Sequence, residues 1–240
     1  MNVKVFPSEF EVNEALAEWT CNLIIKTLKS QEYFTMALSG GNTPRLLFQK
    51  LASKKYIDKI DWKRVHVFWG DERMVPADDD RNNAKMAFEN LLQHTDIPEK
   101  NVHRIRVDIE PLFAAEDYNH RLHNYFDNRS TSFDLIFLGL GEDGHTLSLF
   151  PGSGVIEETN EWVSFTFNEK QEARVTLLPV LVNKSSFIVF LVAGEKKAAI
   201  VQRVLEETYQ PLALPAQIIK PVNGELFWFL DEDAAQKLTP

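Results

Sequence analysis

The sequence is short of the features that mark secreted and membrane proteins. It contains one cysteine, Cys21, so no disulfide can form within the chain, and this composition favours a reducing compartment such as the cytoplasm. The first residues, MNVKVFPSEF, lack the basic and apolar regions of a signal peptide. The purely apolar runs span only a few residues, whereas a membrane-spanning helix needs about 20. We therefore expect a cytoplasmic protein with no membrane partner.

Positive charge is also in the minority. The chain has 26 Lys and Arg against 35 Asp and Glu, a formal net charge of −9, which argues against a nucleic-acid partner. A small anionic ligand remains compatible with this balance, because salt screens charges beyond about 8 Å and a few local N–H groups can outweigh them. No set of His, Cys or carboxylate residues has metal-ligand spacing, so neither a metal nor a cofactor is expected.

The chain has no obvious internal boundary. No Gly/Ser-rich linker, repeat or low-complexity tract interrupts it, so residues 1–240 are expected to form a single domain. Ser8 and Glu11 have capping-box spacing, and Thr43 as cap before Pro44 marks a second helix start. The predicted helices are the segment after Ser8, TPRLLFQKLAS, NNAKMAFENLLQ, residues 111–126, EKKAAIVQRVLEE and DEDAAQKL.

Short, continuously apolar runs between these helices predict β-strands. They are FTMALSGG, RVHVFWGDER, FDLIFLGLG, WVSFTF, RVTLL, SFIVFLVAG and LFWFL. Several of them are followed directly by a helix, which is typical of a parallel sheet covered by helices on both faces. The segment before the first of these strands is expected to form only one amphipathic helix. The predicted fold class is α/β with a mostly parallel sheet.

Four of the predicted strands end in glycines or charged residues. The segments are SGGNTP, WGDER, GLGEDGH and GEKK. Functional loops of a parallel sheet gather at the carboxyl ends of its strands, so we expect these segments to build one composite site.

SGGNTP is suited to bind an anion. Gly40 and Gly41 allow a tight turn, and the helix that begins at Pro44 offers unpaired N–H groups. It is not a nucleotide P-loop, because no Gly-Lys-Ser/Thr follows, and a purely structural turn is the alternative. Ser39 also resembles the serine of a nucleophile elbow, but no earlier strand loop precedes it to complete an oxyanion hole.

Charged residues at the other strand ends are candidate partners of such an anion. Asp71 and Arg73 follow a strand, and they either bind substrate or form a solvated turn. Arg174 begins RVTLL and Lys197 lies at the start of a predicted helix. Both are ordinary surface residues unless the fold brings them to the glycine turn.

The segment GLGEDGHTLSLFPG contains the G-x-G-x-x-G spacing of dinucleotide-binding loops. Pro151 and Gly152 leave no room for the long helix that such a loop needs, and no acidic residue ends the next apolar run. The segment instead exposes Asp143 and His145 beside flexible backbone. Histidine exchanges protons near neutral pH, so His145 is a candidate general base, with a buried structural histidine as the alternative.

Taken together, these motifs resemble the 6-phosphogluconolactonase family, within the glucosamine-6-phosphate isomerase/deaminase superfamily. The combination of SGGNTP with GLGEDGHTLSLFPG is the most specific part, and the likeness extends over about residues 33–235. It implies a Rossmann-like α/β sandwich without nucleotide, and hydrolysis of 6-phospho-D-glucono-1,5-lactone in the oxidative pentose phosphate pathway.

The resemblance also implies roles for particular residues. Catalytic roles around the lactone carbonyl fall to Asp71, Asp143 and His145. Phosphate and sugar contacts fall to Ser39, Gly40, Gly41, Asn42, Thr43, Arg73, Arg174 and Lys197. The sequence departs from the family pattern at Leu178, where a second Thr is usual, and at Asn82, where Ser is usual.

In the implied reaction, His145 removes a proton from water, which attacks the lactone carbonyl. Either Asp71 or Asp143 orients the imidazole or the water, and N–H groups or Arg73 stabilise the oxyanion. The rival activities are a glucosamine-6-phosphate deaminase, a sugar-phosphate sensor and a serine esterase acting through Ser39. HTLSLF supplies no acid for the deaminase relay, and the sequence leaves open whether the protein is a monomer or a weak dimer.

Overall fold

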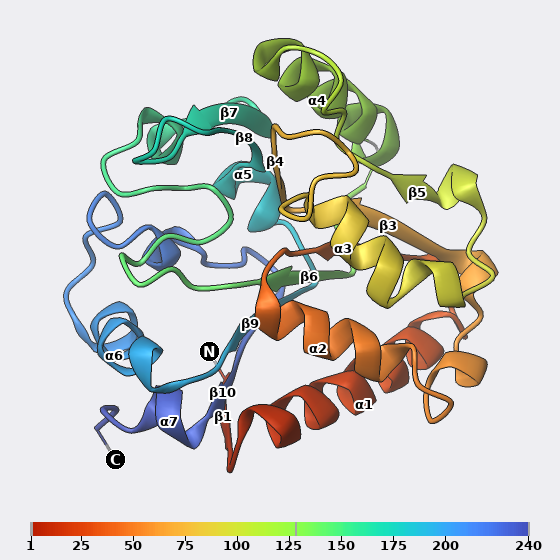
Figure 1. Ribbon diagram of the computed structural model, residues 1–240, viewed down its shortest axis with the longest axis horizontal. Helices are drawn as coiled ribbons and strands as arrows, with labels where there is room; N and C mark the ends of the chain where they lie inside the picture. The colour runs from red at the N-terminus through yellow and green to blue at the C-terminus, as the bar shows by residue number, and fades with distance from the viewer. Residues whose placement is uncertain (1, 128, 240) are drawn as a thin grey trace.

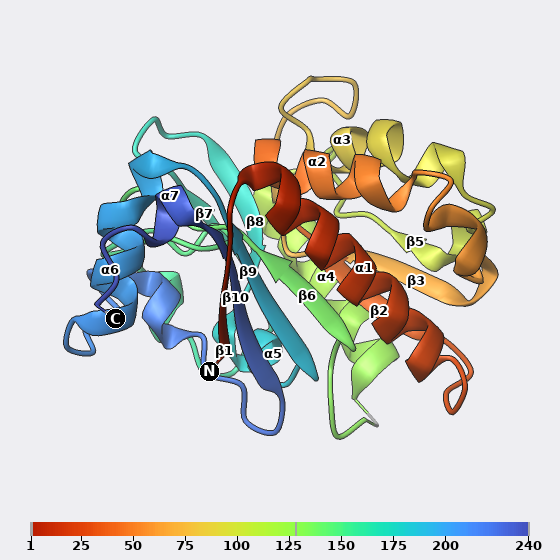
Figure 2. The same ribbon diagram turned by 90° about the horizontal axis from the view of Figure 1, so that it is seen from below.

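The computed structural model describes residues 2–127 and 129–239, and within them a seven-stranded, wholly parallel sheet forms the centre (Figures 1 and 2). Its strands, in spatial order, are β1 (Asn2–Phe6), β10 (Glu225–Asp231), β9 (Phe187–Val192), β6 (Leu135–Leu138), β2 (Phe34–Leu38), β3 (Val65–Trp69) and β5 (Val102–His103). The inner strands β2, β6 and β9 consist of almost entirely buried residues, as expected for a sheet covered on both faces.

Helices cover both sides of this sheet. The two long N-terminal helices α1 (Glu9–Thr27) and α2 (Asn42–Leu51) lie along one side, with α3 (Asn83–Asn90) beside them (Figure 1). The opposite side carries α4 (Pro111–Phe126). The short helix α5 (Pro179–Val182) follows β8 (Ala173–Leu177), a strand of a second, smaller sheet. Near the C-terminus, α6 (Ala198–Glu206) packs against α7 (Glu232–Ala235). No helix among the described residues is long and apolar enough to cross a membrane. The predicted α/β class with a mostly parallel sheet is confirmed.

A second, smaller sheet was not predicted as a separate unit. It consists of β4 (Asp71–Arg73), β8 (Ala173–Leu177) and β7 (Val163–Phe167), all antiparallel, and α4 packs on it. RVHVFWGDER is therefore not one strand, because the chain leaves the main sheet at Gly70. The backbone of Gly70 joins the two sheets, with its N–H donating to Leu38 and its carbonyl accepting from Leu177.

Two further expectations at helix and strand starts are wrong. The N-terminus begins with β1, which pairs in parallel with β10, although its residues are mostly exposed and show no apolar run. Thr43 does not cap α2. The cap position is Gly41, which has φ +115°, and the Thr43 hydroxyl donates instead to Glu9 at 3.3 Å. The helix over residues 111–126 and the capping role of Ser8 are confirmed.

The buried phenol of Tyr118 fixes the strand end that leads to the predicted site. Its hydroxyl donates to the carbonyl of Trp69 and accepts from the N–H of Trp69, both at 3.0 Å. Burial raises the pKa of Tyr118, so the hydroxyl keeps its proton for this bond. The bond ties α4 to the last residue of β3, next to Gly70 and Asp71.

Candidate active site

A cleft of about 400 Å³ lies where the carboxyl ends of β2 and β6 meet the small sheet. Larger hollows of about 660 to 710 Å³ occur elsewhere on the described surface, but neither histidine nor arginine lines them. The cleft is lined by eight of the predicted residues, namely Ser39, Gly40, Gly41, Asp71, Arg73, His145, Arg174 and Lys197. All four predicted loops contribute to it, so the expectation of one composite site agrees with the geometry.

His145 and Asp143 form a hydrogen-bonded pair at the edge of this cleft. The imidazole Nδ1 lies 2.5 Å from Asp143 Oδ1, and the same oxygen accepts the His145 backbone N–H at 3.1 Å. A carboxylate acceptor at Nδ1 places the proton of the neutral ring there, which leaves Nε2 with its lone pair for a substrate or water. Burial alone would raise the pKa of Asp143, but the hydrogen bond and charge of His145 hold it below its usual range.

Glycines let the loop fold back on this pair. Gly141 donates its N–H to the carbonyl of His145 at 2.8 Å, and its carbonyl accepts from Gly144 at 3.1 Å. A Cβ on Gly141 would lie 2.1 Å from His145 Nδ1 and 2.5 Å from Asp143 Oδ1. Gly144 has φ +87°, a backbone conformation that residues other than glycine rarely adopt. The glycine spacing that resembles a nucleotide loop therefore serves the His145–Asp143 pair.

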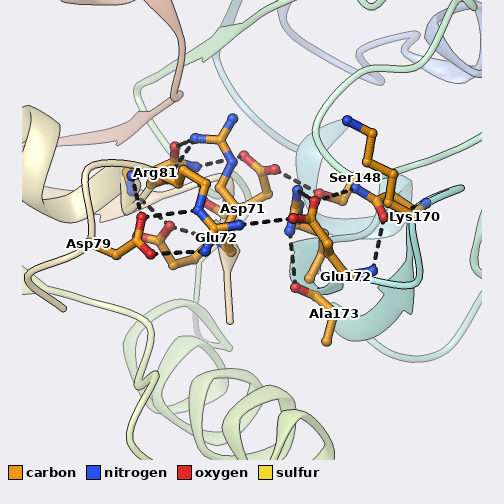
Figure 3. A network of polar contacts seen from close by, with 12 residues as sticks. Asp71, Glu72, Asp79, Arg81, Ser148, Lys170, Glu172 and Ala173 are labelled. Atoms are coloured by element: carbon orange, nitrogen blue, oxygen red, sulfur yellow. Dashed lines mark hydrogen bonds and ion pairs between the residues drawn. The ribbon is translucent and has the colours of Figure 1, made fainter. Parts of the chain in front are cut away.

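The structure pairs His145 with Asp143, whereas the carboxylate of Asp71 has other partners. Asp71 is 8% exposed, and its Oδ2 accepts from the Ser148 hydroxyl at 2.7 Å (Figure 3). Ser148 also donates its backbone N–H to the hydroxyl of Thr176 at 3.1 Å, and Thr176 faces Asp71 across the β4–β8 pair. Asp71 and Thr176 thereby hold the loop in place at Ser148, three residues after His145.

Two arginines face each other on the small sheet beside this loop. Arg73 and Arg174 are direct register partners in the antiparallel β4–β8 pair, and both line the cleft. Arg174 donates to Glu172 at 3.0 Å, and Glu172 also accepts from Arg81 at 2.9 Å (Figure 3). Like charges directly opposite on a sheet repel, so an anion bound between these guanidinium groups would be stabilised by both.

Lys197 adds a third cation from the main sheet side. Its ammonium donates to the carbonyl of Leu140 at 2.6 Å, in the same loop as His145. Burial lowers the pKa of Lys197, while the charges of Glu142 and Asp143 act in the opposite direction. The other three predicted site residues, Asn42, Thr43 and Asp143, are not among the residues that line the cleft.

Sequence reasoning missed several residues of the cleft. Asn83, Ser148, Phe150 and Asn168 all line it. The ring of Phe150 lies 4.9 Å from that of His145, centroid to centroid. Ser148 and Phe150 belong to the motif that contains His145, and their position there was the available signal. Asn83 directly follows Asn82, a position at which the sequence was compared with the family pattern, whereas Asn168 lies in a segment with no catalytic pattern.

Comparison with known proteins identifies the family to which this chain belongs. The family model described as glucosamine-6-phosphate isomerases/6-phosphogluconolactonase matches residues 7–228. The chain belongs to this family. A 6-phosphogluconolactonase of Haemophilus influenzae is 38% identical over 203 residues, which cover 85% of this chain and 87% of that protein. One from Synechocystis is 37% identical over 90% of both chains.

Two solved structures superpose closely on this chain. The 6-phosphogluconolactonase of Trypanosoma brucei matches with a TM-score of 0.87 at 29% identity, covering 99% of this chain and 98% of that one. A monomeric glucosamine-6-phosphate deaminase matches with a TM-score of 0.84 at 18% identity, and this likeness shows the shared fold alone. The Rossmann-like arrangement expected from the motifs is confirmed.

Proposed function

We propose that this chain hydrolyses 6-phospho-D-glucono-1,5-lactone to 6-phospho-D-gluconate, in the oxidative pentose phosphate pathway. The observation that carries the proposal is that His145, hydrogen-bonded to Asp143, lines the same cleft as the facing residues Arg73 and Arg174. A general base and a dianion site within one cleft are what hydrolysis of a sugar-phosphate lactone requires. The relatives that bear the name 6-phosphogluconolactonase support the same reaction.

His145 is the proposed general base. The neutral imidazole takes a proton from water through Nε2 while the water oxygen bonds to C1 of the lactone. Asp143 holds the ring in the required tautomer and stabilises the imidazolium that forms. The imidazolium then returns the proton to the ring oxygen as the C1–O bond breaks, so the enzyme ends the cycle in its starting state.

The phosphate group of the substrate is proposed to bind between Arg73 and Arg174, with Lys197 nearby. Ser39, Gly40 and Gly41 line the same cleft at the start of α2, where Asn42 and Thr43 supply backbone N–H groups of the first turn. The first turn of α2 has no acidic residue and Gly41 offers no side-chain cap, so these donors remain suited to an anion. Asp71, fixed by Ser148, is proposed to orient the loop and to contact the sugar or water.

The direct test is an assay of lactone hydrolysis with substrate generated in situ from glucose 6-phosphate. We expect purified protein to accelerate lactone disappearance and to leave glucosamine 6-phosphate unchanged in a coupled deaminase assay. Deamination without lactone hydrolysis would contradict the proposal. Tight binding of sugar phosphates without either reaction would point instead to a sensor.

The cytoplasm is the proposed site of action. The sole cysteine, Cys21, is 2% exposed and packs in the core, as expected for a structural residue in a reducing compartment. Some plant relatives carry the description chloroplastic, so compartments differ within the family.

Replacing Arg174 by Met should raise KM for the phosphorylated lactone by about 10- to 100-fold, the loss of one charge-assisted hydrogen bond. The kcat should change little, because Arg174 is proposed to bind the phosphate and not the reacting carbon. Steady-state kinetics of Arg174→Met against Arg203→Met, an exposed arginine of α6 paired with Glu207, provide the comparison. An unchanged KM in Arg174→Met would contradict a phosphate site between the two arginines.

A further inference from the structure

The side-chain amide of Asn83 contacts three other residues of the cleft, Arg73, Asp71 and Gly40. Asn83 is the first residue of α3 and is 1% exposed, although it lines the cleft. Its Oδ1 accepts a hydrogen bond from Nη1 of Arg73. Its Nδ2 donates to the Asp71 carbonyl at 2.9 Å and lies 3.4 Å from Asp71 Oδ1. The amide is oriented by a donor on one side and acceptors on the other, so it has one satisfactory orientation.

The backbone of Asn83 is held as firmly as its side chain. The buried carboxylate of Glu72 accepts the backbone N–H groups of Arg73, Asn83 and Ala84, each at 2.8 Å. Burial raises the pKa of Glu72 to about 7, against the opposing effect of these three donors. The first turn of α3 is thereby attached to β4, which fixes the backbone of Asn83 relative to that of Arg73.

Gly40 packs directly against the same amide. A Cβ on Gly40 would lie 1.8 Å from Asn83 Oδ1, and its three nearest heavy atoms would all belong to Asn83. The φ of Gly40 is not positive, so the backbone conformation itself does not require glycine. Glycine at this position is therefore explained by the close contact with Asn83. The side chain of Asn83 thus contacts both the glycine turn and Arg73.

We propose that Asn83 is a positioning residue that fixes the guanidinium group of Arg73 toward the substrate phosphate, and that it thereby makes the enzyme select phosphorylated lactones. The inference rests on the proposed function. Arg73 has two anchors in the described structure, Asn83 Oδ1 and the carbonyl of Arg81 at 3.0 Å, and both engage Nη1. Because both anchors hold Nη1, the plane of the guanidinium group is fixed. Its Nε and Nη2 groups are thereby preorganised to bind an anion.

The test compares two substrates that differ only in the phosphate. In Asn83→Ala, KM for 6-phosphogluconolactone should rise by about tenfold, while kcat changes little, because a charge-assisted hydrogen bond that orients Arg73 is lost. Hydrolysis of unphosphorylated glucono-1,5-lactone should fall by a much smaller factor, because that substrate has no phosphate for Arg73 to bind. An equal loss on both lactones would overturn the inference, since it would indicate general damage to the cleft.

A matched control comes from the neighbouring residue. Asn82 caps the same helix by accepting the Lys85 N–H at 2.9 Å and has no hydrogen bond with Arg73. Asn82→Ala should lower the melting temperature, because a helix cap is lost, and leave the preference for the phosphorylated lactone intact. A loss of that preference equal to the loss in Asn83→Ala would assign the effect to helix stability and overturn the inference.

Gly40 supplies a second, independent variant. Gly40→Ala alone should weaken binding of 6-phosphogluconate, because the new methyl group displaces Asn83. In Gly40→Ala/Asn83→Ala the space is vacated, so the double variant should bind no more weakly than Asn83→Ala alone. Additive losses in this cycle would contradict the coupling. Calorimetric titration with 6-phosphogluconate needs no turnover, so an Asn83-dependent affinity in a protein without lactonase activity would overturn the proposed function and support this inference.

Discussion

Replacing His145 by Ala is expected to lower kcat for the phosphorylated lactone by about 10²–10⁴-fold, the usual cost of removing a positioned general base. KM should change little, because the phosphate contacts are proposed to come from Arg73, Arg174 and Lys197. The remaining activity would come from substrate binding and from oxyanion donors that the substitution leaves in place. Direct measurement of lactone disappearance under saturating substrate checks the prediction.

Two companion variants sharpen this experiment. His120 is exposed on α4, away from the cleft, so His120→Ala should retain wild-type kcat. Asp143→Asn keeps the shape of the partner but removes its charge, so we expect a loss between about tenfold and that of His145→Ala, as for other partners that orient a catalytic histidine. Near-wild-type kcat in His145→Ala would remove His145 from the mechanism and leave the cleft without its proposed base.

Local signals in the sequence predict the main sheet well and the small sheet poorly. β2, β6 and β9 are apolar on both faces, which only a covered parallel sheet requires, and α4 begins at a proline that fits a first helical position. β7 and β8 are equally short runs, and nothing local distinguishes antiparallel pairing with residues 71–73 from a place in the main sheet. β1 alternates valine with polar residues over only five positions and lacks a continuous apolar run, as expected for an exposed edge strand.

The site was predictable where its residues end a strand or belong to a glycine-containing motif. His145 and the glycine turn at Gly40 fall in this class. The choice between Asp71 and Asp143 as partner of His145 was open, because it depends on how the loop folds back at Gly141. Asn83 was not predicted as part of the site. Its contacts with Arg73 and Asp71 arise from the way α3 packs on β4, and no local pattern encodes that packing.

Gly141→Ala should inactivate the enzyme nearly as strongly as His145→Ala, although it leaves every proposed catalytic side chain in place. The added methyl group would lie 2.1 Å from His145 Nδ1, far inside contact distance, and 2.5 Å from Asp143 Oδ1. The imidazole and the carboxylate would both have to shift to make room for it. We expect a fall in kcat of about 10²-fold or more, because a base that is displaced loses both its tautomer control and its reach.

The control for this variant is Gly154→Ala, since a Cβ on Gly154 would meet nothing within 4 Å and its φ is not positive. That variant should keep wild-type kcat and thermal stability. In the double variant Gly141→Ala/His145→Ala, kcat should be no lower than in His145→Ala, because both changes remove the same interaction and their effects are not additive. A further multiplicative loss would show that Gly141 contributes to catalysis apart from the histidine, for example through its backbone N–H, and the single role assigned to the glycine would be wrong.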